Sequence, residues 1–354
     1  MTEKKSFDEL VSEISLKFTG DPETDFSLLF EEAGKIGDGD LARAVIRACS
    51  RVIERTLPEE NRKKLERLSM TSAAVLNAEI EEIHFTLFKR EYATALPMAE
   101  SLVRRIEDFK MYQDDSEDEF RCFNEFFEEI LYYQIYKPSR RITWIGLKFH
   151  TIYFLYGNIL FELKRFDEAR AALLKGLHWN PIDFNLMSEY AETYKSTGKM
   201  ESFFDVTLDA FKIAFHPKDV ARCYRNLGYC FTEKELYRPA AVCYGLSLLY
   251  DEDSATAYHE LEYIRQKSGG EFRQPTREEV DECCEEHRIL RGPYDDVIGL
   301  SVAMGRESFK RKQFGWARYY LGIAYGLTQA KEIKNLLDLI PDEDSETGES
   351  ADGE

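Results

Sequence analysis

Residues 153–181 read YFLYGNILFELKRFDEARAALLKGLHWNP, and this stretch decides the fold. A glycine near its start is followed twelve residues later by an alanine, and the rest of the chain repeats that spacing. Three pairs share it: Gly157 with Ala169, Gly228 with Ala240, and Gly305 with Ala317. The second pair lies 71 residues after the first, and the third lies 77 residues after the second. Small residues that recur in step predict stacked helical hairpins.

The glycine and the alanine have a packing role in such a hairpin. A glycine in the first helix removes a side chain where the second helix crosses it, and an alanine in the second helix does much the same from the other side. The two helix axes can then approach to about 8–10 Å. Because a glycine inside a helix costs about 1 kcal/mol relative to alanine, its recurrence in matched positions indicates a packing requirement. Pro181 ends the first hairpin, since its ring cannot continue the helical hydrogen bonds.

Helical patterns also dominate the rest of the chain. Apolar residues recur at intervals of three and four, and strand-like alternation is rare. The pattern predicts four regions: a helical N-terminal region with a degenerate repeat at 1–112, an acidic loop at 113–119, a solenoid with a capping helix at 120–340, and a disordered acidic tail at 341–354. The tail carries seven acidic residues and no basic one, which is typical of a solvated segment.

The repeats resemble the tetratricopeptide repeat (TPR) family, whose unit is a 34-residue helical hairpin. The resemblance is strongest at 150–183 and 221–254, weaker at 184–217 and 298–331, and weakest at 73–110. The residues that carry it are Tyr156, Gly157, Leu160, Phe166, Ala169 and Pro181 in one unit, and Tyr224, Leu227, Gly228, Phe231, Tyr237, Ala240 and Tyr244 in another. It implies an all-α, right-handed superhelical solenoid of TPR-like hairpins with an N-terminal helical extension.

The resemblance further implies an adaptor that holds a protein or peptide on a concave face built from the first helix of each hairpin. The family's groove positions fall here on Phe154, Asn158, Phe161, Glu189, Glu192, Arg222, Arg225 and Tyr229. The two arginines would pair with acidic or carbonyl groups of the partner, and Tyr229 would serve as a flat anchor.

One TPR subgroup clamps the C-terminal carboxylate of chaperones with asparagine and basic side chains. Asn158 and Arg222 match that clamp, whereas Phe154, Glu189 and Asn226 do not. Because a glutamate in the clamp would repel a carboxylate, a chaperone tail is not the expected ligand. The mixed lining instead favours a segment with both charges and an apolar anchor.

Composition narrows the class of partner. The 354 residues carry a formal net charge of -19, which argues against general binding to nucleic acid. The polar residues after Met1 do not form a signal peptide, and no apolar run is long enough for a membrane span. Seven cysteines without a framework spacing indicate reduced thiols. We therefore expect a cytoplasmic protein with a protein partner, and no contact with nucleic acid or membrane.

The sequence offers no pattern of catalytic residues. Its six histidines are not spaced with aspartate or serine as in a hydrolase, and there is no glycine-rich phosphate loop. Cys283, Cys284 and His287 do not suit a metal site, because adjacent helical cysteines point about 100° apart and structural zinc needs two close ligand pairs. We expect no enzymatic activity, no cofactor and no metal.

The aromatic residues between 120 and 136 leave two interpretations open. They predict one helix, whose aromatic stripe is either core or a partner site. The second possibility suggests another role for the whole protein: a structural subunit of a homo-oligomer or obligate complex, assembled through helical faces. Neither the oligomeric state nor the partner follows from the sequence.

Overall fold

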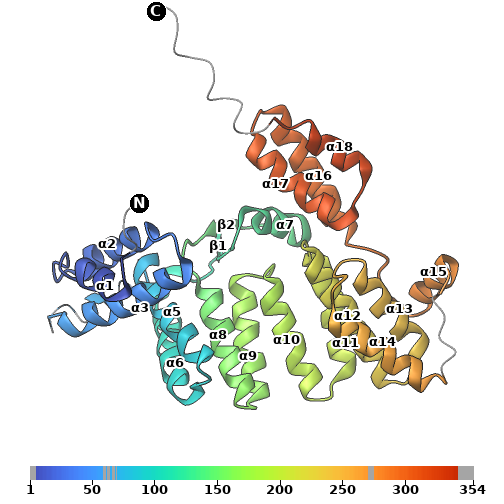
Figure 1. Cartoon of the computed structure of the whole chain (residues 1–354), viewed down its shortest axis with the longest axis horizontal. Coiled ribbons are helices and arrows are strands. Elements are labelled where there is room, and N and C mark those ends of the chain that lie inside the picture. Colours follow the sequence, from blue (N-terminus) through green and yellow to red (C-terminus); the bar gives the residue numbers. More distant parts are fainter. Residues whose placement is uncertain are drawn as a thin grey trace, which may run out of the picture. The chain divides into compact units, whose positions relative to one another are not determined.

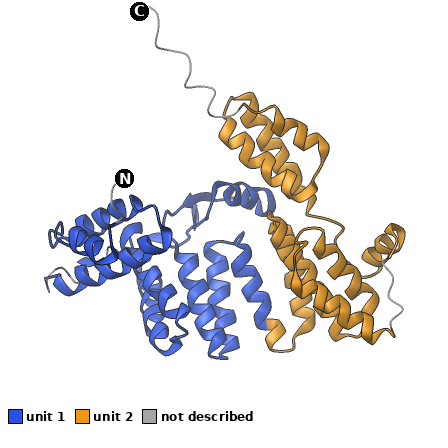
Figure 2. Cartoon of the chain, in the orientation of Figure 1, with its two compact units in different colours: residues 1–193 blue, residues 194–354 orange. Residues whose placement is uncertain are grey.

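The computed structural model describes residues 5–58, 61, 64, 65, 68, 70–269 and 275–341. Except for Pro341, the predicted acidic tail lies outside these residues. Within them the chain is helical except for two short strands, and its helices pack as successive hairpins, so the predicted all-α solenoid is confirmed (Figure 1). The chain divides into two compact units, unit 1 at Met1–Thr193 and unit 2 at Tyr194–Glu354 (Figure 2).

Unit 1 begins with helices that carry clear start signals. The side chains of Ser6, Asp21 and Asp38 cap the first three helices by accepting backbone N–H groups of the first turn. The helices of this part are α1 (Phe7–Ser15), α2 (Pro22–Gly34), α3 (Gly39–Thr56), α5 (Ala73–Phe88) and α6 (Tyr92–Asp108). Helices α1 to α3 share one apolar core, and α5 and α6 contribute to a second core with the helix that follows.

The rest of unit 1 contains the first repeat and, before it, an unexpected insertion that runs from Lys110 to Trp144. Its elements are the 3₁₀ turn η1 (Lys110–Tyr112), β1 (Asp118–Arg121), α7 (Phe126–Tyr136), β2 (Arg141–Trp144), α8 (Phe149–Glu162), α9 (Phe166–Trp179) and α10 (Phe184–Ser196), the last of which crosses into unit 2. Helices α8 and α9 form the predicted hairpin.

Unit 2 holds two further glycine-containing hairpins, α12 with α13 and α16 with α17. Its helices are α11 (Met200–Ile213), α12 (Pro217–Glu233), α13 (Tyr237–Leu248), α14 (Ala255–Lys267), α15 (Arg277–Glu286), α16 (Asp295–Lys310), α17 (Phe314–Thr328) and α18 (Lys331–Asp338). The buried hydroxyl of Tyr224 donates to the carbonyl of Leu290 at 2.9 Å and accepts from the N–H of Gly292 at 2.8 Å. This pair of bonds fixes the segment between α15 and α16 onto α12.

The recurring glycines lie at close helix contacts, as the sequence predicts. A Cβ atom on Gly157 would stand 2.6 Å from Leu173 Cγ. The corresponding contacts are 2.9 Å from Gly228 to the ring of Tyr244 and 2.6 Å from Gly305 to Leu321 Cγ. In every case the neighbour lies one helical turn beyond the recurring alanine. The glycine therefore makes room for a large side chain, and the fully buried alanine keeps the second helix close.

Helix α16 allows the packing role of glycine to be measured against a control in the same helix. We expect Gly305→Ala to lower the free energy of unfolding by about 1–2 kcal/mol, because overpacking outweighs the gain in helix propensity. At Gly299 no heavy atom lies within 4 Å of the place that a Cβ atom would occupy, so Gly299→Ala should raise stability by about 0.5–1 kcal/mol. Urea denaturation of both variants measures the difference, and two changes of the same sign would contradict the packing role.

The insertion corrects two predictions. Strands β1 and β2 pair in parallel, with Asp118 opposite Arg141 and Arg121 opposite Trp144, and α7 connects them. The predicted helix 120–136 therefore starts only at Phe126. The predicted acidic loop 113–119 is part of folded unit 1 and supplies the first two residues of β1. The reason is long-range charge pairing, since acidic residues before β1 and within it bind arginines on both strands.

The compact units also differ from the predicted regions. The division at 193/194 falls within α10, whereas the predicted boundary was the acidic segment at 113–119. All seven cysteines are buried and free of disulfides. No helix among the described residues is both long and apolar enough to cross a membrane.

Candidate partner-binding surface

The eight predicted groove residues lie on three first helices, as expected, but in both units. Unit 1 carries Phe154, Asn158 and Phe161 on α8 and Glu189 and Glu192 on α10, and unit 2 carries Arg222, Arg225 and Tyr229 on α12. A single groove formed by all eight stays a prediction, and the two groups are described separately below.

The predicted aromatic residues of unit 1 serve mainly in packing. Phe154 is half-buried against two apolar cores, one of which includes Leu173 and Leu186. Phe161 packs edge-on against Phe166 of the same hairpin, with ring centres 5.3 Å apart. These side chains hold the hairpin together and offer a partner only part of their surface.

In unit 2 the predicted residues of α12 already have partners. Arg225 Nη1 lies 2.9 Å from Asp251 Oδ2. Tyr229 receives Lys195 Nζ over its ring at 4.5 Å and packs edge-on against Phe203 at 6.3 Å. Tyr229 is therefore held in a cation–π cluster, and part of its ring is exposed. The exposed part of the Tyr229 ring can still serve as a flat anchor. Arg225 is not a free cation, because Asp251 already pairs with it.

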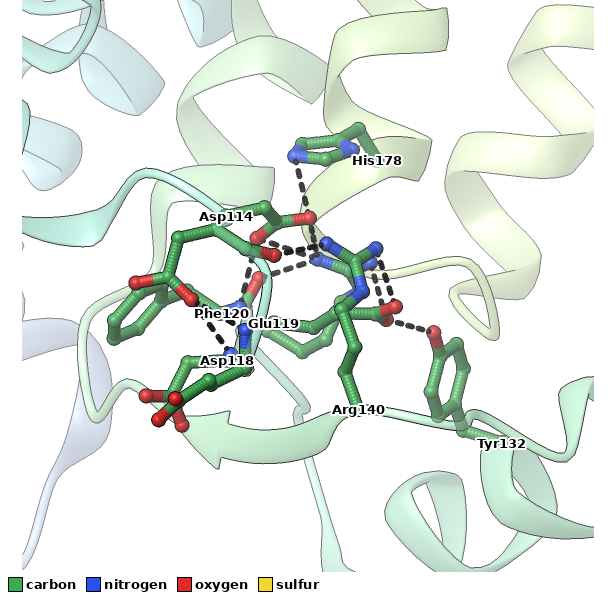
Figure 3. Close-up of polar contacts among 10 residues, drawn as sticks. Asp114, Asp118, Glu119, Phe120, Tyr132, Arg140 and His178 are labelled. Atoms are coloured by element: carbon green, nitrogen blue, oxygen red, sulfur yellow. Dashed lines mark hydrogen bonds and ion pairs between the residues drawn. The ribbon is translucent and has the colours of Figure 1, made fainter.

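A buried ion network holds the insertion in unit 1 (Figure 3). Arg121 and Glu119 on β1 are both less than one-tenth exposed. Arg121 Nη2 donates to Glu119 Oε2 at 2.8 Å, and Nη1 donates to Asp114 Oδ2 at 3.0 Å. Glu119 also accepts from the hydroxyl of Tyr132 at 2.9 Å and lies 2.5 Å from Arg140 Nη2. The network thus joins β1, α7 and the loop before β2.

A second buried polar cluster fixes the start of α7 to the repeat helices. Glu128 Oε2 accepts from the backbone N–H of Asn124 at 2.6 Å and from Asn180 Nδ2 at 2.8 Å. Asn124 Nδ2 also donates to Asp183 Oδ2 at 3.1 Å, and Asn124 Oδ1 lies 2.8 Å from His150 Nε2. Because these residues come from α7, α8 and the α9–α10 turn, the cluster ties the insertion to the first repeat.

Burial controls the charges of this cluster. It raises the pKa of Glu128 to about 7, although hydrogen bonds from Asn124 and Asn180 oppose the shift. Burial also lowers the pKa of His150, so the imidazole is neutral at pH 7, and Asp183 offsets only part of that effect. The 3.8 Å approach of His150 to Asp183 is therefore a contact of a neutral ring with a carboxylate.

The outer side of the insertion exposes a group of large aromatic side chains, which we call the aromatic face. Phe126, Tyr133 and Tyr136 on α7 and Trp144 on β2 are each between 40% and 47% exposed. The three positions on α7 repeat on one side of the helix, while Phe127 and Leu131 on its other side are fully buried.

Ring contacts connect most of the aromatic face. Trp144 packs edge-on against Phe123 with centres 5.9 Å apart, and Phe123 lies 5.6 Å from Tyr132. Tyr132 in turn stacks on Tyr136 at 4.9 Å and meets Tyr133 at 6.4 Å. The exposed rings therefore rest on buried ones that the ion network holds in place.

The aromatic face is not among the site residues predicted from the sequence. Phe123, Phe127 and Tyr132 are core, as one interpretation of the 120–136 stripe expects. The aromatic face is exposed, and the partner-site interpretation stays a prediction. A signal was available: α7 carries aromatic or aliphatic residues on every side, more than one buried stripe requires. No group of histidine, cysteine or acidic side chains among the described residues could hold a metal ion.

The hairpin geometry shows the type of fold. Three hairpins place a glycine of the first helix against a large residue of the second helix, in one fixed register.

The fold is TPR-like.

No protein-family model matches the sequence, and no curated protein matches it. Among solved structures, the TPR-like chain is similar to YrrB, a TPR protein with an unusual peptide-binding site, at 12% identity over 73% of this chain and 98% of that chain, with a TM-score of 0.41. It is also similar to BtubC from P. vanneervenii, at 13% identity over 64% and 85% of the two chains, with a TM-score of 0.41. The C-terminal part of a TPR repeat-containing protein from Cytophaga hutchinsonii matches at 10% identity over 78% and 92%, with a TM-score of 0.38.

Proposed function

We propose that this TPR-like protein is a non-catalytic scaffold that binds a protein partner through the aromatic face. The observation that carries the proposal is four large aromatic side chains exposed on an insertion that two buried polar networks hold rigid. Aromatic residues are enriched at protein interfaces and dominate their binding energy. Because the rings are already ordered, little side-chain entropy is lost on binding.

The net charge of the chain supports a protein partner. At -19 the molecule repels polyanions, so stacking of these rings on nucleic acid bases would lack the electrostatic attraction that such binding requires. A partner with an apolar patch ringed by basic residues would match both the aromatic face and the overall charge.

A matched pair of double variants tests the proposal. Tyr133→Ala/Trp144→Ala removes two rings of the aromatic face, and Tyr258→Ala/Tyr263→Ala removes two rings of similar exposure on α14. A partner captured from the native cell by the wild type would be purified and its affinity measured by calorimetry. We expect at least about a tenfold loss for the first variant and little change for the second. Equal affinities for both variants would refute the proposal.

The same variants test two other assignments. If the protein is instead a structural subunit that self-associates through the aromatic face, light scattering will show an oligomer that Tyr133→Ala/Trp144→Ala dissociates. If the predicted groove also contributes, Arg222→Glu should weaken binding of the purified partner. Arg225 is not used for this test because charge reversal there would also break its ion pair with Asp251.

A further inference from the structure

An open depression of about 660 Å³ lies between α3 and α5 in unit 1, and it shares no residue with the aromatic face. Its lining combines charged and aromatic side chains: Asp40, Arg43 and Arg47 from α3, and Glu81, His84, Phe85 and Phe88 from α5. Phe88 is 86% exposed, the highest value among the large apolar residues that the structure describes. An aromatic ring so exposed beside a depression calls for an explanation.

Arg47 is the central group of this depression. Its side chain is only 15% exposed, yet its guanidinium donates no hydrogen bond to any residue in the described part of the chain. The nearest carboxylate oxygen, Glu81 Oε2, is 3.9 Å away. The guanidinium instead lies over the ring of Phe85, 4.2 Å from its centre. The cation–π contact uses the face of the guanidinium and leaves its N–H donors to the solvent of the depression, where a ligand can reach them.

The other charges leave a local excess of positive charge. Lys89 Nζ is 4.2 Å from the centre of the same Phe85 ring, so two cations flank one ring. Arg43 pairs with Asp40 in an exposed ion pair, which contributes little and is easily exchanged for another carboxylate. The lining itself carries two cations, Arg43 and Arg47, and two carboxylates, and Lys89 beside Phe85 adds a third cation next to it, in a chain whose net charge is -19.

We propose that this depression binds an acidic peptide segment in which a carboxylate adjoins an apolar side chain. The carboxylate would accept the unused donors of Arg47 in the bidentate geometry that guanidinium groups favour. The apolar side chain would cover Phe88. Glu81 and Asp40 disfavour a phosphate group, whose higher charge they would repel at close range. This site goes beyond the proposed function, because it takes a different ligand on different helices.

Short peptides provide the test on the full-length chain. The probe is acetyl-Glu-Phe-Asp-Glu-amide, and its control replaces each acid by the corresponding amide. Binding is followed by NMR through the ring protons of His84 and by calorimetry. Arg47→Gln should weaken binding of the acidic peptide at least about tenfold, whereas Arg51→Gln, one turn further along α3 and paired with Glu82, should leave it unchanged.

A second variant keeps the proposal testable if Arg47→Gln disturbs the fold. Phe88→Ala alters an exposed side chain and should weaken the acidic peptide about fivefold through lost apolar contact. The proposal is overturned if the acidic peptide does not bind, if the amide peptide binds equally well, if inorganic phosphate displaces the acidic peptide at equal concentration, or if both Arg47→Gln and Phe88→Ala bind like the wild type.

Discussion

Replacing Arg121 with alanine is expected to lower the free energy of unfolding by about 3–5 kcal/mol, the cost of breaking a buried ion pair from one side. Glu119 would keep its contacts with Tyr132 and Arg140 but would lose its hydrogen bond from the buried guanidinium of Arg121. Asp114 would lose both bonds from Arg121 Nη1. The remaining carboxylates would then repel each other in a poorly hydrated site.

The neighbouring strand supplies a matched control for Arg121. Arg141 also pairs with an aspartate, Asp118, but its side chain is mostly exposed. Arg141→Ala should therefore cost less than about 1 kcal/mol. Urea denaturation followed by fluorescence measures both variants, because Trp144 and Trp179 lie in unit 1. If Arg121→Ala and Arg141→Ala lower the free energy of unfolding equally, burial of the ion network contributes nothing to stability.

The Arg121→Ala variant also tests binding of a partner by the aromatic face. Since the ion network positions α7 and β2, Arg121→Ala should also weaken binding of a partner held by the aromatic face, even though Arg121 is buried and is not part of that face. Arg141→Ala separates the two effects, because it removes an exposed charge near the face while keeping the network. The structural role of Arg121 and the proposed function of the aromatic face are thus linked by one side chain.

The hairpins could be predicted from the sequence because their determinants are local. Gly157, Gly228 and Gly305 each act within one hairpin, and the spacing to the second helix recurs. Gly176 has an equally close contact, 2.7 Å from Leu186 Cδ2, that the repeated spacing does not predict. That glycine packs against the following helix, and its position does not recur as glycine in the other two hairpins.

The insertion could not be predicted because its determinants are distant in sequence. Glu119 and Arg121 look like solvated residues until Tyr132 and Arg140 are brought beside them. Strand β1 consists of three charged residues and one phenylalanine, so it gives no apolar pattern for a strand. A better signal was the match between the acidic run before residue 120 and the basic pair before Ile142.

The predicted groove residues were transferred from the positions that line the groove in the TPR family. Those positions do not specify what each side chain contacts in this chain. Phe161 packs within its own hairpin, and Arg225 is occupied by Asp251, a residue in the loop after α13. Both contacts depend on side-chain orientation, which helix periodicity does not specify. The aromatic face is not among the predicted site residues because the sequence pattern leaves open whether the aromatic stripe between 120 and 136 is core or a partner site.

Glu128→Gln is expected to change how stability depends on pH, by about 3 kcal/mol between pH 4.5 and 7. Burial raises the pKa of this carboxyl to about 7 in the folded protein, against 4.5 without burial. Across that window the folded state binds more protons at this site than the unfolded state. The wild type therefore loses stability through Glu128 as the pH rises, and the loss is complete above about pH 7. A glutamine has no proton to lose.

His150 changes the stability with pH in the opposite direction. The free energy of unfolding of Glu128→Gln must therefore be compared with that of the wild type at each pH. Its lowered pKa means that the folded state binds fewer protons there, and stability through His150 rises with pH over the lower part of the same window. In the wild type the contributions of Glu128 and His150 therefore oppose each other, while Glu128→Gln keeps only that of His150, so the variant should gain stability relative to the wild type as the pH rises.

Glu128 affects stability through its hydrogen bonds and through the burial of its charge, and these two effects can be separated by their pH dependence. Glutamine keeps an oxygen for Asn124 N–H and Asn180 but faces Asn124 Nδ2 with a second donor, which should cost about 1–2 kcal/mol at every pH. Burial of the charge adds a cost to the wild type only at higher pH. Denaturation at pH 5, 6, 7 and 8 gives the difference, with the exposed Glu117→Gln as the control. If the difference between Glu128→Gln and wild type is constant with pH, Glu128 is not a buried titrating group, and the anchor of α7 rests on hydrogen bonds alone.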